Sequence, residues 1–287
     1  MLLTSITGVS SLNPSVSADA SEIVGNAPPS RVTFKLLTER AFQSRLHPKD
    51  SNEQKIPTVS AICPRDEIFR VTSMVGDLTK FFLANTFEDH RRSRSSQLIE
   101  QEVEEKNSIC GQILLILCLL AKSCDLEIAQ CCVGKVALNG RKYPTDLCKG
   151  KANSYTAYSA ETGISKNKGQ SILPAVDSSG ERSDYTLSDE LSVEELTLVV
   201  RKFVDDRNWA QFHTPRNILL ALIGELGELA ELFQWVGDKE YVQDYNFDCE
   251  KKDKIGQEIA DVTIYLMRLC DLCEIDLGRA ALRVLEK

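Results

Sequence analysis

The chain has 287 residues, of which 43% are hydrophobic and 26% are charged, with a formal net charge of −8. This length and hydrophobic content suffice for one large domain or two ordinary domains with a substantial core. The acidic balance argues against binding to duplex nucleic acid, which requires a basic face, but a nucleotide substrate stays possible because a metal ion can supply positive charge locally.

Residues 1–31 are rich in Ser, Ala, Asn and Pro, and this composition predicts a disordered N-terminal segment. No Lys or Arg precedes Arg31, so the segment lacks the charged start of a secretory signal and the Arg-rich character of a transit peptide. The longest apolar run, Ile113–Ala121, is too short to cross a bilayer and predicts a buried helix. We therefore expect no membrane segment and no membrane partner.

A polar stretch at 151–189 is typical of a linker. It divides the chain into a first block at 32–150 and a second block at 190–287. Two separate structural units are therefore expected.

The second block has helical spacing throughout. Ser192-Val193-Glu194-Glu195 fits a capping box, and Thr214-Pro215 predicts a second helix that continues to about Trp235. Further helices are expected over about 251–273 and from about Asp276 to the end of the chain. Because no strand-period pattern competes with these helices, the fold class is predicted to be all-α.

Two glycines, Gly224 and Gly227, lie inside the second of these helices. Each costs a helix about 1 kcal/mol relative to Ala. Glycine in such a position often permits close approach of another backbone, so we expect tight helix packing there.

Cysteine usage indicates a reducing compartment. Cys270 and Cys273 have CxxC spacing, but no second pair follows at the spacing of a zinc site. The surrounding patterns are apolar and helical, which favours buried thiols, while metal or redox use stays the alternative. An intracellular, cytosolic protein is the resulting expectation.

Four acidic residues form two pairs on consecutive predicted helices. Glu225 and Glu228 are three residues apart, as are Glu258 and Asp261, so each pair shares one helix face at the border of an apolar stripe. Carboxylates that converge in a half-buried cleft repel one another unless a cation neutralises them. Mg²⁺, which prefers oxygen ligands, is the expected cation. The alternative is a solvated acidic face, to which Glu231 would also belong.

The same residues carry a resemblance to a known family. The run 224–235, GELGELAELFQW, followed by 257–262, QEIADV, resembles the ExxE…ExxD signature of MazG-like pyrophosphohydrolases. Together with 207–209 and 212–217, these motifs closely resemble the dCTP pyrophosphatase subgroup over about residues 192–287. The resemblance implies an all-α, MazG-like helical bundle that hydrolyses a nucleoside triphosphate, dCTP or a modified dCTP, to the monophosphate and diphosphate in nucleotide-pool sanitation. It also implies a homo-oligomer.

The resemblance further implies roles for individual residues. The catalytic and metal-ligating set that matches the family is Glu225, Glu228, Glu258 and Asp261. The substrate-binding set is Trp209, His213, Trp235 and Tyr265, in which the tryptophans would stack on the nucleobase. Without the resemblance, a tryptophan is more often a core residue and a histidine before a helix cap is more often a polar loop residue.

Internal similarity suggests that residues 32–150 are a degenerate copy of the same module. The four ligand positions there read Asp77, Lys80, Ile109 and Gln112, and a lysine and an isoleucine cannot bind Mg²⁺. We therefore expect an inactive first copy.

The first copy keeps a segment that the second lacks. Residues 137–144 resemble the family's C-terminal helix with its Asn…Tyr-Pro ending, whereas the second copy stops at Lys287 before such a segment. One hypothesis is that Asn139, Lys142 and Tyr143 fill this gap within the chain or in trans. The competing interpretations are a truncated product with reduced activity and a catalytically inactive nucleotide-binding or structural helical bundle.

Overall fold

The computed structural model describes residues 31–46, 62–83, 96–151, 191–236 and 247–287. Within these ranges the regular structure is helical, and the extended pairing is a single antiparallel bridge between Thr33 and Ser192. The all-α prediction is therefore confirmed. The helices are α1 (Phe34–Leu46), α2 (Pro64–Lys80), α3 (Ser96–Ser123), α4 (Ile128–Lys142), α5 (Thr145–Cys148), α8 (Val193–Asp206), α9 (Pro215–Glu231), α10 (Cys249–Leu272) and α11 (Leu277–Glu286).

The predicted helix starts in the second block are confirmed. Ser192 accepts a hydrogen bond from the Glu195 backbone N–H, and the Glu195 carboxylate accepts one from the Ser192 N–H, which completes the capping box of α8. Thr214 caps α9 through the Asn217 N–H, with Pro215 in the first turn. These caps satisfy backbone donors that a helix start otherwise leaves unpaired.

The second predicted helix is shorter than its apolar spacing indicated. The regular part of α9 ends at Glu231 instead of near Trp235. The last turn tightens, with the N–H of Phe233 bonded to the carbonyl of Ala230, and the buried Phe233 ring packs edge-on against Phe247 at 5.7 Å. Apolar residues continue through this turn, so spacing alone overestimates the length of the helix.

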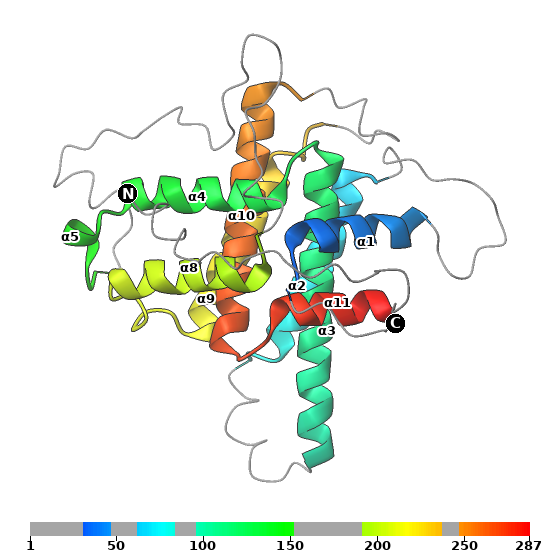
Figure 1. The fold of residues 1–287 in the computed structure, drawn as a ribbon, viewed down its shortest axis with the longest axis horizontal. Coiled ribbons are helices and arrows are strands. Elements are labelled where there is room, and N and C mark those ends of the chain that lie inside the picture. Colours follow the sequence, from blue (N-terminus) through cyan, green and yellow to red (C-terminus); the bar gives the residue numbers. More distant parts are fainter. Residues whose placement is uncertain (1–30, 47–61, 84–95, 152–190, 237–246) are drawn as a thin grey trace, which may run out of the picture. The chain divides into compact units, whose positions relative to one another are not determined.

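The longest helices, α3 and α10, organise the packing. Helix α2 packs beside α3 and α9 packs beside α10, while α1 and α11 lie across α3, and α4 and α8 lie across α10 (Figure 1). The helix that follows each long helix therefore packs on the long helix of the other half, α4 on α10 and α11 on α3. Residues 31–287 form one compact unit, and a single apolar core draws on both halves of the sequence.

Close backbone approach occurs at a different glycine from the two that were expected. A Cβ on Gly111 of α3 would lie 2.6 Å from backbone atoms of Ala280 in α11. At Gly224 and Gly227 of α9 a Cβ would meet nothing within 4 Å. The expectation of tight packing at the α9 glycines was therefore wrong, because the neighbouring helix does not approach that side of α9.

The two halves share local details. After α3, Asp125 adopts a φ of 58°, and after α10, Glu274 adopts a φ of 57°, each at the turn into the next helix. These parallels agree with the tandem-copy hypothesis, which stays a prediction. The expected disordered segment at 1–31 and the linker at 151–189 lie almost entirely outside the described residues.

Among the described helices, none alone has the length and apolar content to cross a membrane. One bent pair, α3 with α4, meets these two criteria when taken together.

Candidate active site

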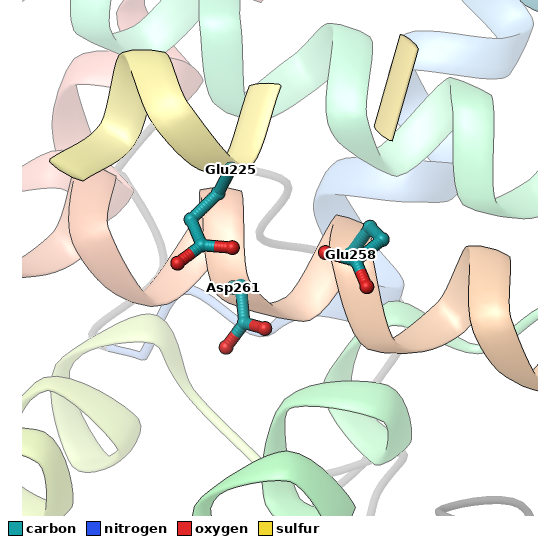
Figure 2. Close-up of side chains that lie close together, drawn as sticks. All are labelled: Glu225, Glu258 and Asp261. Carbon is teal, nitrogen blue, oxygen red and sulfur yellow. The ribbon is translucent and has the colours of Figure 1, made fainter. Parts of the chain in front are cut away.

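Three of the four predicted acidic residues meet between α9 and α10. Glu225 comes from α9, and Glu258 and Asp261 lie one turn apart on α10. Each offers a carboxylate oxygen within 4.8 Å of the others. In Figure 2 the Glu225 side chain reaches from α9 towards the α10 pair. Glu228 is not part of this group of three, although its charge raises the pKa of Glu225, Glu258 and Asp261.

The cluster is electrostatically unfavourable as it stands. Burial raises the pKa of Glu225 to about 7, and the charges of Asp261, Glu228 and Glu258 add to the effect. Burial likewise raises the pKa of Glu258 to about 7 against the opposing charge of Lys135. The cluster therefore requires positive charge to be fully ionised.

Part of that positive charge comes from the first half of the chain. The Lys135 ammonium of α4 forms an ion pair with Asp261, and the two side chains are only 11% and 13% exposed. Burial still raises the pKa of Asp261, even though the charge of Lys135 and its hydrogen bond lower it. One lysine does not balance the group.

The residues present suit a divalent metal ion. Glu258 Oε2 is buried and has no hydrogen-bond partner among the described residues. A buried carboxylate oxygen without a partner is costly, and a metal ion would satisfy it. The donors of the group are all carboxylate oxygens, the type preferred by Mg²⁺. Glu225, Glu258 and Asp261 therefore fit a hard divalent cation.

A cavity of about 270 Å³ opens beside the acidic cluster, with Asp261 in its wall. Its volume is close to the lower end of the usual range for ligand sites. Aromatic side chains come from α8, α10, the residue after α4 and the loop before α9, and polar groups lie between them. The wall residues are Val136, Asn139, Tyr143, Lys151, Val200, Phe203, Val204, Trp209, Phe212, His213, Asp261, Ile264, Tyr265 and Arg268.

Trp209 is held in this wall by the first half of the chain. Its indole Nε1–H donates to the carbonyl of Cys148 at 3.0 Å, and its ring packs edge-on against Tyr143 at 5.3 Å. The carbonyl of Tyr143 in turn accepts a bond from Arg207 Nε at 2.8 Å. The turn after α8 is thus fixed to the segment that follows α4.

His213 lies in the wall next to Trp209, with a ring separation of 6.5 Å. Its Nδ1 accepts a hydrogen bond from Arg268 Nε at 3.3 Å. Burial, and then the charge of Arg268, lower the pKa of His213 to about 4. The imidazole is therefore neutral at physiological pH.

The predicted substrate-binding residues divide into two groups. Trp209, His213 and Tyr265 line the cavity. Trp235, at the end of the turn after α9, is 88% exposed and is not part of the cavity wall. The structure thus does not place both tryptophans around one cavity.

Lys135 and Arg268 are two site residues that were not predicted from the sequence. Lys135 lies four residues before Asn139, on the same helix face, so the Asn…Tyr-Pro segment contained a signal for it. Arg268 lies seven residues after Asp261 and three after Tyr265, a spacing that also shares one face.

The corresponding positions in the first half have different contacts. Lys80 forms an ion pair with Asp77 at 2.6 Å on the surface, Ile109 is buried in the core, and the Gln112 amide bonds to Ser108. The metal-binding geometry found among the described residues is confined to Glu225, Glu258 and Asp261.

Comparisons with known proteins place the chain in a family. No protein-family model matches the chain. The chain is 39% identical to dCTP pyrophosphatase 1 of Rattus norvegicus over 123 residues, which are 43% of this chain and 68% of that protein. It is 42% identical to dCTP pyrophosphatase 1 of Homo sapiens and 41% identical to that of Bos taurus, each over 98 residues, or 34% of this chain. The match spans 57% of the length of each of these last two proteins. At this level of identity and coverage, the chain belongs to the dCTP pyrophosphatase family.

Proposed function

We propose that this protein is a Mg²⁺-dependent pyrophosphohydrolase that converts a deoxynucleoside triphosphate, dCTP or a modified dCTP, to the monophosphate and diphosphate. The observation that carries the proposal is the convergence of Glu225, Glu258 and Asp261 at the edge of an aromatic cavity. Membership of the dCTP pyrophosphatase family supports the same reaction. Removal of such triphosphates would serve nucleotide-pool sanitation.

In this proposal the acidic cluster holds the metal ion. Glu225, Glu258 and Asp261 are its ligands, and Glu228 supplies further negative charge or a water-mediated contact. When bound there, Mg²⁺ would neutralise these carboxylates and stabilise the negative charge that develops on the phosphate oxygens. One of the carboxylates orients the attacking water.

The cavity holds the nucleoside next to the cluster. Asp261 belongs both to the acidic group and to the cavity wall, so a base in the cavity leaves its phosphates beside the carboxylates. The faces of Trp209 and Tyr265 offer stacking surfaces, each worth about 1–3 kcal/mol for a base. The fourth substrate-binding candidate, Trp235, would reach the nucleotide only from outside the cavity.

The N-terminal half completes the site within the same chain. Asn139 and Tyr143 of the α4 segment line the cavity, and Lys135 pairs with Asp261. Lys142 is not part of the wall, but its charge lowers the pKa of Glu258 and Asp261. In this proposal the N-terminal half is an inactive copy that supports the single active site.

The cellular location, the oligomeric state and the partners are proposed from cysteine burial, exposed apolar residues and net charge. Seven of the ten cysteines are buried inside the helical packing, which agrees with thiols in a cytosolic protein. A homo-oligomer is supported by exposed apolar residues on α2 and α3, among them Phe69 and Ile99. The net charge of −8 is consistent with a free nucleotide as substrate and with no duplex nucleic acid as partner.

The test is a diphosphate-release assay with Mg²⁺ and a panel of deoxynucleoside triphosphates. Glu258→Gln should lower kcat roughly 100-fold, because it removes a charged oxygen from the metal group. Glu231→Gln, the same change at an exposed position on α9, should leave kcat unchanged within about twofold. Asn139→Ala should reduce turnover of dCTP if the N-terminal half completes the site.

The outcome separates this reaction from a binding role. Wild-type protein that binds dCTP with Mg²⁺ but releases no diphosphate would favour an inactive nucleotide-binding bundle. Equal activity in Glu258→Gln and wild type would refute the proposed metal site.

A further inference from the structure

A charged network includes Arg268 of the cavity wall. Arg268 and Asp271, one turn apart on α10, have side chains only 7% and 8% exposed. Arg268 Nη1 donates to Asp271 Oδ2 at 2.5 Å. Arg201 of α8 covers the same carboxylate from the surface, with its Nε bonded to the two oxygens at 3.2 and 3.3 Å. These bonds and charges outweigh burial and lower the pKa of Asp271, so it remains an anion that holds Arg268 in place.

Arg268 contacts His213 through a different N–H group from the one that it uses for Asp271. Its Nε–H donates to His213 Nδ1 at 3.3 Å, and both residues belong to the cavity wall. A guanidinium has donors only and keeps its charge at any physiological pH. His213 Nδ1 must therefore present a lone pair, because a proton on Nδ1 would set two N–H groups against each other. The Nδ1–H tautomer and the imidazolium are both disfavoured.

We infer that Arg268 is a positioning residue, which holds His213 as the neutral Nε2–H tautomer so that the ring donates a hydrogen bond to a nucleobase in the cavity. This inference rests on the proposed function, since it names the group that the base meets. Arg268 acts through His213, and Asp271 and Arg201 act through Arg268. Burial first, and then the charge of Arg268, lower the pKa of His213, which favours the same neutral ring.

The chemistry of the base matches this donor. Cytosine has two in-plane acceptors, O2 and N3, whereas thymine carries a proton on N3 and has O2 and O4 as its acceptors. A neutral Nε2–H suits an acceptor of either kind without bringing a second positive charge beside Arg268. Flat aromatic groups such as Trp209 can hold the base plane, but they do not distinguish its edge, so the edge is recognised by the histidine.

The direct test is the tautomeric state of His213 in the wild-type protein without substrate. Nitrogen-detected histidine NMR separates a pyridine-like from a pyrrole-like ring nitrogen. The chain has three histidines, and the His213→Ala spectrum assigns the signal. We expect pyridine-like Nδ1 and pyrrole-like Nε2 at pH 7. An imidazolium or an Nδ1–H tautomer would overturn the inference, and this measurement requires no substitution at Arg268.

The second test uses Arg268→Met, which keeps the length of the side chain and removes its donors. We expect mixed tautomers of His213 and a KM for dCTP raised about 3- to 10-fold, the range for loss of one hydrogen bond, with a smaller change in kcat. The matched control, Lys202→Met, removes an exposed cation of α8 that pairs with Asp206 and does not belong to this network. It should leave the tautomer and KM unchanged within about twofold.

A double substitution separates positioning from general structural support. If Arg268 acts through His213, Arg268→Met should have no further effect on KM in a His213→Ala background. An equal loss in both backgrounds would contradict the inference. The NMR result does not depend on turnover, so a protein that shows the expected tautomer but no hydrolysis would refute the proposed function and leave the positioning intact.

Discussion

Lys135 and Asp261 join the two halves of the chain at the scale of single residues. Their ion pair brings a positive charge from α4 to a carboxylate of α10. Without a metal ion the charge of Lys135, with a smaller effect from Lys142, stands against Glu225, Glu258, Asp261 and the nearby Glu228. Bound protons neutralise part of this negative charge, as the raised pKa values of Glu225 and Glu258 indicate.

This charge balance predicts a pH dependence of stability. The pKa of Glu225 and of Glu258 is about 7 in the folded chain and 4.5 as the reference for the unfolded chain. The folded state therefore holds protons that the unfolded state releases between these values, and its stability falls as the pH rises from 4.5 through 7. In EDTA, the melting temperature of the wild type should be higher at pH 5.5 than at pH 8. This difference should be smaller in the variant carrying Glu225→Gln and Glu258→Gln.

Added Mg²⁺ should reverse this trend. It should raise the wild-type melting temperature at pH 8 and have less effect at pH 5.5, because protons compete for the ligands. Thermal unfolding followed by circular dichroism measures both effects. Identical pH slopes in wild type and the double variant would contradict the account.

At the scale of elements, α3 and α11 cross with a close backbone approach at Gly111. Gly111 permits it, since a Cβ would lie 2.6 Å from the Ala280 backbone. A backbone contact cannot yield as a flexible side chain can. The crossing also attaches the C-terminal helix of the second half to the first half.

Gly111→Ala should therefore lower the free energy of unfolding by about 1–3 kcal/mol, the usual cost of overpacking. The matched control is Gly76→Ala in α2, where a Cβ would meet nothing within 4 Å. That substitution should stabilise the helix by about 0.5–1 kcal/mol. Urea denaturation of the two variants gives both values, and equal stability would show that α11 does not pack as described.

At the scale of the whole molecule, one core serves both halves. Leu117 of α3 and Leu222 of α9 are both fully buried in the same apolar cluster. The long helix α3 is covered by α11 of the second half, and the long helix α10 is covered by α4 of the first half. Neither half has a separate interior. Residues 190–287 taken alone would therefore lack α4, which packs on α10 in the whole chain.

A shared core predicts one cooperative unfolding transition. Leu117→Ala and Leu222→Ala should each cost about 2–5 kcal/mol and shift the same single transition to lower temperature. Differential scanning calorimetry should give equal calorimetric and van't Hoff enthalpies. Two transitions, with one substitution affecting only one of them, would indicate independent modules.

Much of the helical structure and part of the site could be predicted from the residues. Ser192 and Thr214 marked helix starts because their side chains satisfy local backbone donors, and this depends on neighbours in sequence. The i, i+3 spacing brought Glu258 and Asp261 onto one face for the same local reason. Two further features were not predictable in this way: Glu228 is exposed and lies outside the group of three acids, and Trp235 is exposed. Both depend on how α9 ends and rotates against α10.

The sequence by itself determined the all-α class, the helix starts, the family and the acidic residues, because each depends on local spacing or on an ordered motif. Only the tertiary structure decided that Lys135, Asn139 and Tyr143 of the first half lie at the acidic cluster and cavity of the second. It also decided that Gly111 forms the close crossing and that Arg268 faces His213. These contacts join residues that are far apart in the chain. They depend on how the helices of the two halves pack against the long helices α3 and α10.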